Sequence, residues 1–98
     1  MSYKETRLSF RTDPNIPFWD FPDSVKQHIE DTYVATGLRE SVSKIFSDDG
    51  LIRTYSGTWK DESSFLLFCK DPVMLQCWVD RDAYNTANDI LSFWQREL

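Results

Sequence analysis

Four prolines set the strongest limits on where regular structure can run in this 98-residue chain. Three stand at positions 14, 17 and 22, and the fourth at 72. Because proline fixes φ and lacks an N–H donor, helices and strands are interrupted there. The segment DPNIPFWDFPD is therefore predicted to be an irregular aromatic loop. At the fourth proline one helix should end and another begin, with Asp71 as N-cap and Pro72 as first helical residue.

The segments between these breaks show alternating strand and helix patterns. Residues 4–12 alternate in polarity with a period of two, which predicts a half-buried strand. In residues 24–37, Ser24 and Gln27 have capping-box spacing and Gly37 suits a helix C-cap, so a helix is expected. Residues 39–47 and 51–59 flank the turn signal DDG and predict a hairpin.

The second half of the chain contains a helix broken at Pro72 and a final apolar segment. Asp61 is expected to cap a short helix whose inner face carries Phe65, Phe68 and Cys69. After the break, Leu75, Val79 and Ala83 recur at every fourth position and predict the buried face of the next helix. Residues 90–98 favour a strand, although a continued helix is the alternative.

The resulting order is βαββαβ, and right-handed crossovers turn this order into a ferredoxin-like α+β fold. We expect a four-stranded antiparallel sheet with two helices on one face, the second helix broken at Pro72. Ninety-eight residues are enough for one core, so residues 1–98 should form a single domain.

The face of the sheet opposite the helices is the first candidate for a functional surface. If Leu8 and Phe10 face the helices, Glu5, Arg7, Ser9 and Arg11 lie on the open face. The residues expected there, as a ligand or dimer surface, are Arg7, Arg11, Lys44, Arg53, Tyr55 and Trp94. The face could be solvated, with ion pairs across strands, or it could pack against a second copy and enclose a partly polar cavity.

The stretch GTWKDESSFLLFCKDP, residues 57–72, resembles the strand, tryptophan, acidic cap, phenylalanine-rich helix and Asp-Pro break of dimeric α+β barrel proteins. This group includes the antibiotic-biosynthesis monooxygenases. The resemblance covers residues 51 to about 89, and beyond them only the strand order. It implies a ferredoxin-like protomer and a homodimer whose sheets form a barrel, but it does not imply oxygenase activity. Haem-degrading members use a histidine ligand, and His28 does not stand in a matching motif.

Charge and composition argue against several classes of partner. Eleven basic and sixteen acidic side chains give a net charge of −5, which repels nucleic acid. No apolar run approaches the roughly 20 residues of a membrane span, and we expect a cytoplasmic protein. Metal binding is not expected, because two cysteines and one histidine include no short CxxC pair. No phosphate-binding glycine loop occurs, and no cofactor is expected.

Individual reactive side chains do not nominate a catalytic centre, and no catalytic residue is assigned. Lys70 could lower the pKa of the Cys69 thiol, but Cys69 shares a face with two phenylalanines and is better explained as a small buried side chain. His28 has no nucleophile or orienting carboxylate that the sequence identifies. Phe18, Trp19 and Phe21 of the proline-rich loop could anchor a partner protein or, alternatively, close one end of the core.

These observations favour a small cytoplasmic homodimer that acts as a binding or protein-interaction module without a cofactor. The partners considered are a second copy, another protein and a small anionic ligand. The alternative is a small-ligand enzyme of the dimeric barrel type, a cofactor-free oxygenase or isomerase, with a cavity lined by Arg7, Arg11, Arg53 and Tyr55. A closed pocket of roughly 300 Å³ or more would favour the enzyme.

Overall fold

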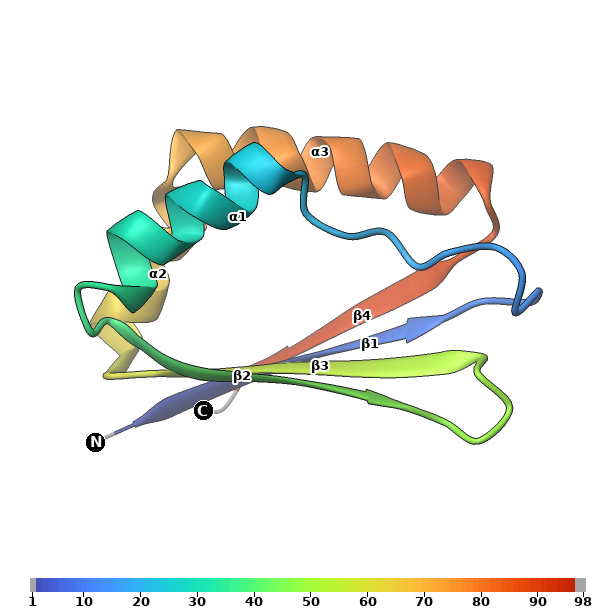
Figure 1. Ribbon diagram of the computed structural model, residues 1–98, viewed down its shortest axis with the longest axis horizontal. Coiled ribbons are helices and arrows are strands. Elements are labelled where there is room, and N and C mark those ends of the chain that lie inside the picture. Colours follow the sequence, from blue (N-terminus) through green and yellow to red (C-terminus); the bar gives the residue numbers. More distant parts are fainter. Residues whose placement is uncertain (1, 97–98) are drawn as a thin grey trace.

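The computed structural model describes residues 2–96 as one sheet covered on one face by helices (Figure 1). The elements in chain order are β1 (Tyr3–Phe10), α1 (Asp23–Ile29), η1 (Glu30–Val34), β2 (Arg39–Phe46), β3 (Ile52–Trp59), α2 (Glu62–Lys70), α3 (Pro72–Ala87) and β4 (Leu91–Arg96). The strands pair antiparallel in the order β2-β3-β1-β4. The predicted ferredoxin-like α+β fold is confirmed, including the final strand; residues 97 and 98 lie outside the described residues.

The break at proline is built as the sequence predicts. Asp61 Oδ1 accepts a hydrogen bond from the backbone N–H of Ser64 at 2.8 Å and so caps α2. Asp71 Oδ1 accepts one from the N–H of Val73 at 2.9 Å, and Pro72 is the first residue of α3. These two caps satisfy N–H groups that have no partner within their helices.

The first helix starts differently from the prediction. It begins at Asp23 after Pro22, whose side chain makes no capping hydrogen bond, so the expected capping box of Ser24 and Gln27 is wrong. Pro22 already supplies a fixed φ of −59° at the entrance. The helix continues into the π-helical turn η1, and Gly37 follows with a φ of 80°, as expected of a residue that ends a helix.

Aromatic side chains dominate the core between the sheet and the helices. Trp59, Phe65 and Met74 are fully buried, and Phe65 stacks on Tyr3 of β1 with ring centroids 5.2 Å apart. Phe68 lies 4.8 Å from the ring of Trp59. These contacts join α2 and α3 to β1 and β3, and they identify the sheet face that carries Tyr3 and Trp59 as the buried one.

The prediction of which face of β1 is covered is therefore wrong. Tyr3, Glu5 and Ser9 are buried under the helices, whereas Phe10 packs edge-to-face on Phe93 on the open side. Strand pairing places Tyr55 and Trp94 opposite Arg7, so all three lie on the face of the sheet that the helices cover. The physical reason is that Tyr3 supplies the apolar anchor of β1 by stacking on Phe65, while Glu5 and Ser9 on the same face lie beside the polar side chains of Arg39 and Ser92.

The predicted inner face of α3 is also wrong. Leu75 and Val79 are 49% and 61% exposed, and Ala83 is exposed as well. The buried residues of this helix are Met74, Cys77 and Asn85. Their spacing of three and eight residues defines a stripe next to the predicted one, because Met74 and Cys77 are the side chains of α3 that pack into the aromatic core. Among the described residues, no helix has the length and apolarity needed to cross a membrane.

Candidate functional site

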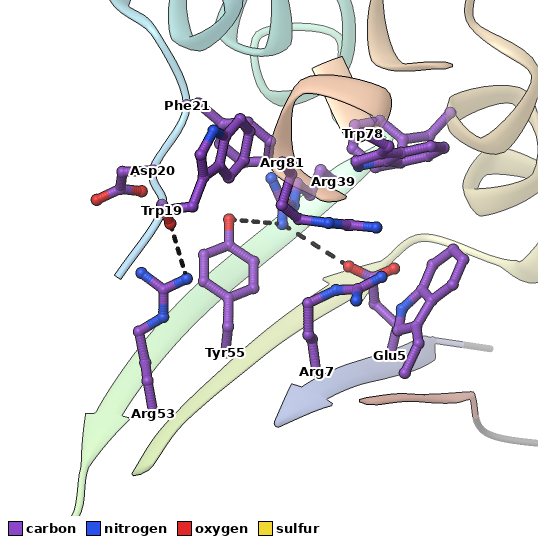
Figure 2. Close-up of a pocket in the computed structure, with 12 residues that line it drawn as sticks. Glu5, Arg7, Trp19, Asp20, Phe21, Arg39, Arg53, Tyr55, Trp78 and Arg81 are labelled. Carbon is purple, nitrogen blue, oxygen red and sulfur yellow. Dashed lines mark hydrogen bonds and ion pairs between the residues drawn. The ribbon is translucent and has the colours of Figure 1, made fainter. Parts of the chain in front are cut away.

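A small cavity of about 50 Å³ lies between the sheet and the helices, at the point where the proline-rich loop crosses the sheet (Figure 2). Its lining combines four arginines with aromatic side chains and two carboxylates. The arginines come from four elements: Arg7 from β1, Arg39 from β2, Arg53 from β3 and Arg81 from α3. Trp19, Phe21, Phe68, Trp78 and Trp94 form the aromatic part of the wall.

Arg39 is the deepest of the four arginines and is 5% exposed. It donates a hydrogen bond to the hydroxyl of Tyr55 at 3.1 Å, and its guanidinium lies 4.0 Å from Glu5 Oε1. Its guanidinium carbon is 5.2 Å from the centre of the Trp59 ring, a cation–π contact. A Cβ at Gly57 would stand 2.9 Å from the Arg39 guanidinium, so glycine at 57 provides the space for this buried ion pair.

Glu5 faces the same cavity and is 6% exposed. Burial raises the pKa of its carboxyl, and the Arg39 and Arg7 cations oppose this rise without cancelling it. Oε2 of Glu5 and Nε of both Arg39 and Arg53 have no hydrogen-bond partner among the described residues. Buried polar atoms without a partner cost stability, so this cluster of charges is expensive to enclose.

Arg7 and Arg53 hold the two ends of the cavity. Arg7 donates to the hydroxyl of Ser92 at 2.9 Å and lies over the ring of Trp94. Burial lowers its pKa to about 10, and the nearby Arg81 cation contributes in the same direction. Arg53 donates to the backbone carbonyl of Trp19 at 2.9 Å, as Figure 2 shows, and burial lowers its pKa too.

A second, more open groove of about 200 Å³ adjoins the cavity on the side of β2 and α1. Asp20, Phe21, Arg39 and Tyr55 line both spaces. The groove alone is lined by Lys26, Ile29, Glu30, Val42 and Lys44. Lys44 also binds the carboxylate of Asp20 at 3.2 Å, which ties the proline-rich loop to β2.

The six residues predicted for a ligand or dimer face do not all reach one site. Arg7, Arg53, Tyr55 and Trp94 line the cavity under the helices, not the open face as the sequence suggested. Lys44 lines the outer groove. Arg11 lies outside both spaces, where it donates to the carbonyls of Gly50 and Ile16 at 2.8 and 2.7 Å and so shapes the loop.

Sequence reasoning missed Arg39 and Arg81 altogether. Pairing of β2 with β3 shifts between Arg39 and Ser41, so simple alternation along β2 does not place Arg39 on the inner face. Arg81 belongs to the stripe of α3 that contains Met74, Cys77 and Asn85, and the wrong stripe was predicted. The sequence signal that could have identified Arg81 is its helical spacing from Cys77 and Trp78, which places it on their face of α3.

The aromatic loop takes the structural role that the sequence left as one of two alternatives. Trp19 and Phe21 pack against the core, with ring centroids 5.3 Å apart. Phe18 is covered by the guanidinium of Arg11 at 4.2 Å and by that of Arg53 at 5.0 Å. The hydroxyl of Tyr84 on α3 donates to the carbonyl of Pro17 at 2.5 Å. The loop thus forms one wall of the cavity.

His28 has the carboxylate partner that the sequence did not reveal. Its Nε2 lies 2.6 Å from Asp71 Oδ2, which also accepts a hydrogen bond from the Tyr33 hydroxyl at 2.5 Å. Burial raises the pKa of Asp71, but the hydrogen bonds from Tyr33 and His28 outweigh it and leave the pKa lowered. This cluster lies away from the arginine cavity and joins α1 and η1 to the start of α3.

The cysteines do not form a reactive pair in the structure. Cys69 packs beside the core, and Cys77 is buried in it. Burial raises the pKa of the Cys77 thiol to about 11, which keeps it protonated at neutral pH. Within residues 2–96, no group of three or more histidine, cysteine or acidic side chains is arranged to hold a metal ion.

The fold and the site together define a ferredoxin-like α+β protein with a cationic cavity beneath its helices. No protein-family model matches the chain, and no curated protein sequence matches it. Among solved structures, that of Rv0793 from Mycobacterium tuberculosis is similar with a TM-score of 0.43 and 10% sequence identity. The match covers 98% of this chain and 95% of that one.

Proposed function

We propose that the protein is a binding module that holds a small organic anion in the arginine cavity. The observation that carries this proposal is the convergence of four arginine side chains on one buried space that contains only two carboxylates. Arginine presents several N–H groups in a plane and forms paired hydrogen bonds with carboxylates and phosphates. A bound anion would accept hydrogen bonds from the guanidinium N–H groups of the lining, which can only donate.

The lowered pKa of an arginine in the cavity also supports an anionic ligand. The lowered pKa of Arg7 arises from burial and from repulsion by Arg81, so its charge is stabilised less than that of a solvated arginine. A bound anion would offset both effects. The protein as a whole is acidic, so this site is a local exception to a net charge of −5.

The size of the cavity favours binding over catalysis. About 50 Å³ is well below the roughly 300 Å³ at which ligand pockets of enzymes usually begin. We therefore propose a binding module as the first candidate function, and this proposal requires no cofactor. The thiols of Cys69 and Cys77, which form no disulfide, fit a reducing compartment, and we propose a cytoplasmic location.

Titration with acetate, followed by amide chemical shifts, tests the proposal. We expect saturable shifts at residues that line the cavity, and loss of saturation in Arg7→Met and in Arg53→Met. Lys60→Met is the matched control, because Lys60 is an exposed cation outside the cavity. Equal acetate responses in wild type and both cavity variants would contradict the proposed function.

Glu5 favours a proton-transfer enzyme, an isomerase, as the second candidate function. A carboxylate with a raised pKa beside an arginine-bound acid could remove the proton from the carbon next to a carbonyl. The C–H electron pair would pass to the carbonyl oxygen, and Glu5 would return the proton in the reverse step. Exchange of the methyl hydrogens of pyruvate in D₂O, measured by NMR, should then depend on Glu5 and stop in Glu5→Gln.

We propose further that two copies associate through the open face of the sheet, as the resemblance to dimeric α+β barrel proteins implies. Ile45, Leu91 and Phe93 on this face are 63%, 63% and 54% exposed. The other described side chains of the face are mostly serines and threonines, which can both donate and accept hydrogen bonds. A face with little charge lets two acidic molecules meet without repulsion.

A further inference from the structure

The outer groove and the arginine cavity are adjacent parts of one interior. Asp20, Phe21, Arg39 and Tyr55 line both, so the two spaces lie on either side of these four side chains. Figure 2 shows the hydroxyl of Tyr55 directed toward Arg39, to which it is hydrogen-bonded. Arg39 lines the groove as well as the cavity, so a ligand that lies in the groove meets one of the four arginines directly.

The two spaces differ in chemistry. The cavity concentrates guanidinium groups around Glu5. The groove has an apolar floor formed by Phe21, Ile29 and Val42. Its rim carries two lysines and two carboxylates, which leaves the rim without a strong preference for either charge. A molecule that extends from one space into the other must be anionic at its inner end and apolar beyond it.

We propose that the ligand is a short-chain carboxylic acid whose carboxylate lies among the arginines and whose alkyl chain lies on the apolar floor of the outer groove. This inference rests on the proposed anion-binding function and specifies its ligand class. The groove volume of about 200 Å³ limits the chain to a few carbons. In this arrangement Val42 of β2 contacts the alkyl chain of the ligand. Ile45, on the same strand, faces the opposite side of the sheet.

A homologous series of carboxylates tests the inference. Acetate, butanoate and hexanoate are titrated into the protein, and dissociation constants are taken from amide chemical shifts. Burial of each methylene should tighten binding by about fourfold until the groove is filled. An affinity that does not change from acetate to hexanoate would overturn the inference, although acetate binding itself would leave the proposed function standing.

Two variants on β2 show where the alkyl chain of the ligand binds. Val42→Gln, which places an amide on the groove floor, should remove the dependence on chain length and retain acetate binding. Ile45→Gln is the control and should behave as the wild-type protein does, with circular dichroism confirming that both variants fold. If Ile45→Gln removes the dependence and Val42→Gln does not, the chain binds the open sheet face and the inference is wrong. If acetate and all longer acids fail to bind, the proposed function fails.

Discussion

Asp71 makes three different contacts with one side chain. Oδ1 caps α3 through the N–H of Val73, and Oδ2 is shared by His28 and Tyr33. Burial raises the pKa of Tyr33, as does its hydrogen bond to the carboxylate, so Tyr33 stays a donor throughout the neutral range. The residue therefore joins the first helix to the helix break at Pro72.

We predict that Asp71→Ala destabilises the protein by about 2 to 3 kcal/mol, because it removes a cap and leaves two side-chain partners unsatisfied. Asp61→Ala is the matched control, since Asp61 caps α2 and bonds only to Ser64 within the described contacts. Its loss should cost about 1 kcal/mol. Urea denaturation measures both. Equal losses would show that the contacts with His28 and Tyr33 contribute nothing.

Glu5 should make the free energy of unfolding depend on pH in the opposite direction to a carboxylate whose pKa is lowered by folding. Its pKa is raised in the folded state above the ordinary value of 4.5. The folded state then binds more protons, so the free energy of unfolding falls as the pH rises from the ordinary pKa through the raised one. Asp71, whose pKa is lowered, contributes in the other direction and loses its stabilisation in acid.

We predict that Glu5→Gln removes the Glu5 contribution to this pH dependence. Relative to wild type, the variant should become more stable as the pH rises above the ordinary pKa of 4.5, because it has no buried carboxyl to ionise. Urea denaturation at several pH values gives the free energy of unfolding of both proteins. Because Asp71 is present in both, its contribution cancels in the difference between variant and wild type. A difference that stays constant with pH would show that Glu5 does not titrate with a raised pKa.

At the level of elements, α3 shows how a correct helix can be assigned with the wrong buried face. Met74 is fully buried, while Val79 is 61% exposed. We predict that Met74→Ala costs about 2 to 5 kcal/mol through the cavity that it leaves. Val79→Ala should change stability by less than about 0.5 kcal/mol. Thermal and urea unfolding of the two variants compare the faces, and a larger loss for Val79→Ala would contradict the structure.

The positions of the strands and helices could be predicted because their signals are local. Asp61 and the Asp71-Pro72 pair mark helix starts through backbone chemistry, and Gly37 marks an end through its positive φ. Which face a strand buries is not local. Alternation grouped Arg7 with Glu5 correctly, but Leu8 and Phe10 were the more apolar set and suggested the wrong side.

The burial of the candidate site could not be predicted from local sequence signals either. Arg7, Arg53 and Tyr55 could be grouped from the sequence because strand parity brings them together. Their burial depends on Glu5, on the missing side chain at Gly57 and on Arg39, which come from three different strands. No pattern within one segment encodes such an arrangement, since the desolvation of each charge is offset only by partners distant in sequence.

At the scale of the whole molecule, the two sides of the sheet differ in charge: one carries buried charged groups and the other carries few. The arginines are enclosed beneath the helices, and the open face is largely apolar or hydroxylated. We predict that the double variant Ile45→Glu with Phe93→Glu lowers the dimer fraction, because like charges would meet at the contact. Light scattering at several protein concentrations measures the mass.

The control for this experiment is Leu75→Glu with Val79→Glu on the outer surface of α3. Both residues are exposed, at 49% and 61%, so the same change in net charge is made away from the sheet. This variant should retain the wild-type mass. Dissociation caused equally by both double variants would attribute the effect to net charge and contradict an interface on the open face.

The irregular pairing at the start of β2 has a consequence for how this chain could tolerate length changes. Because the register shifts between Arg39 and Ser41, Arg39 and Val42 face the same side despite an odd spacing. Deleting Glu40 would remove the extra residue, and strict alternation would then keep Arg39 and Val42 on the same side of the sheet. A one-residue deletion at Glu40 should thus leave the inner and outer surfaces of β2 in place, whereas a deletion at Ser43, in the regularly paired part of the strand, would exchange them on one side of the deletion.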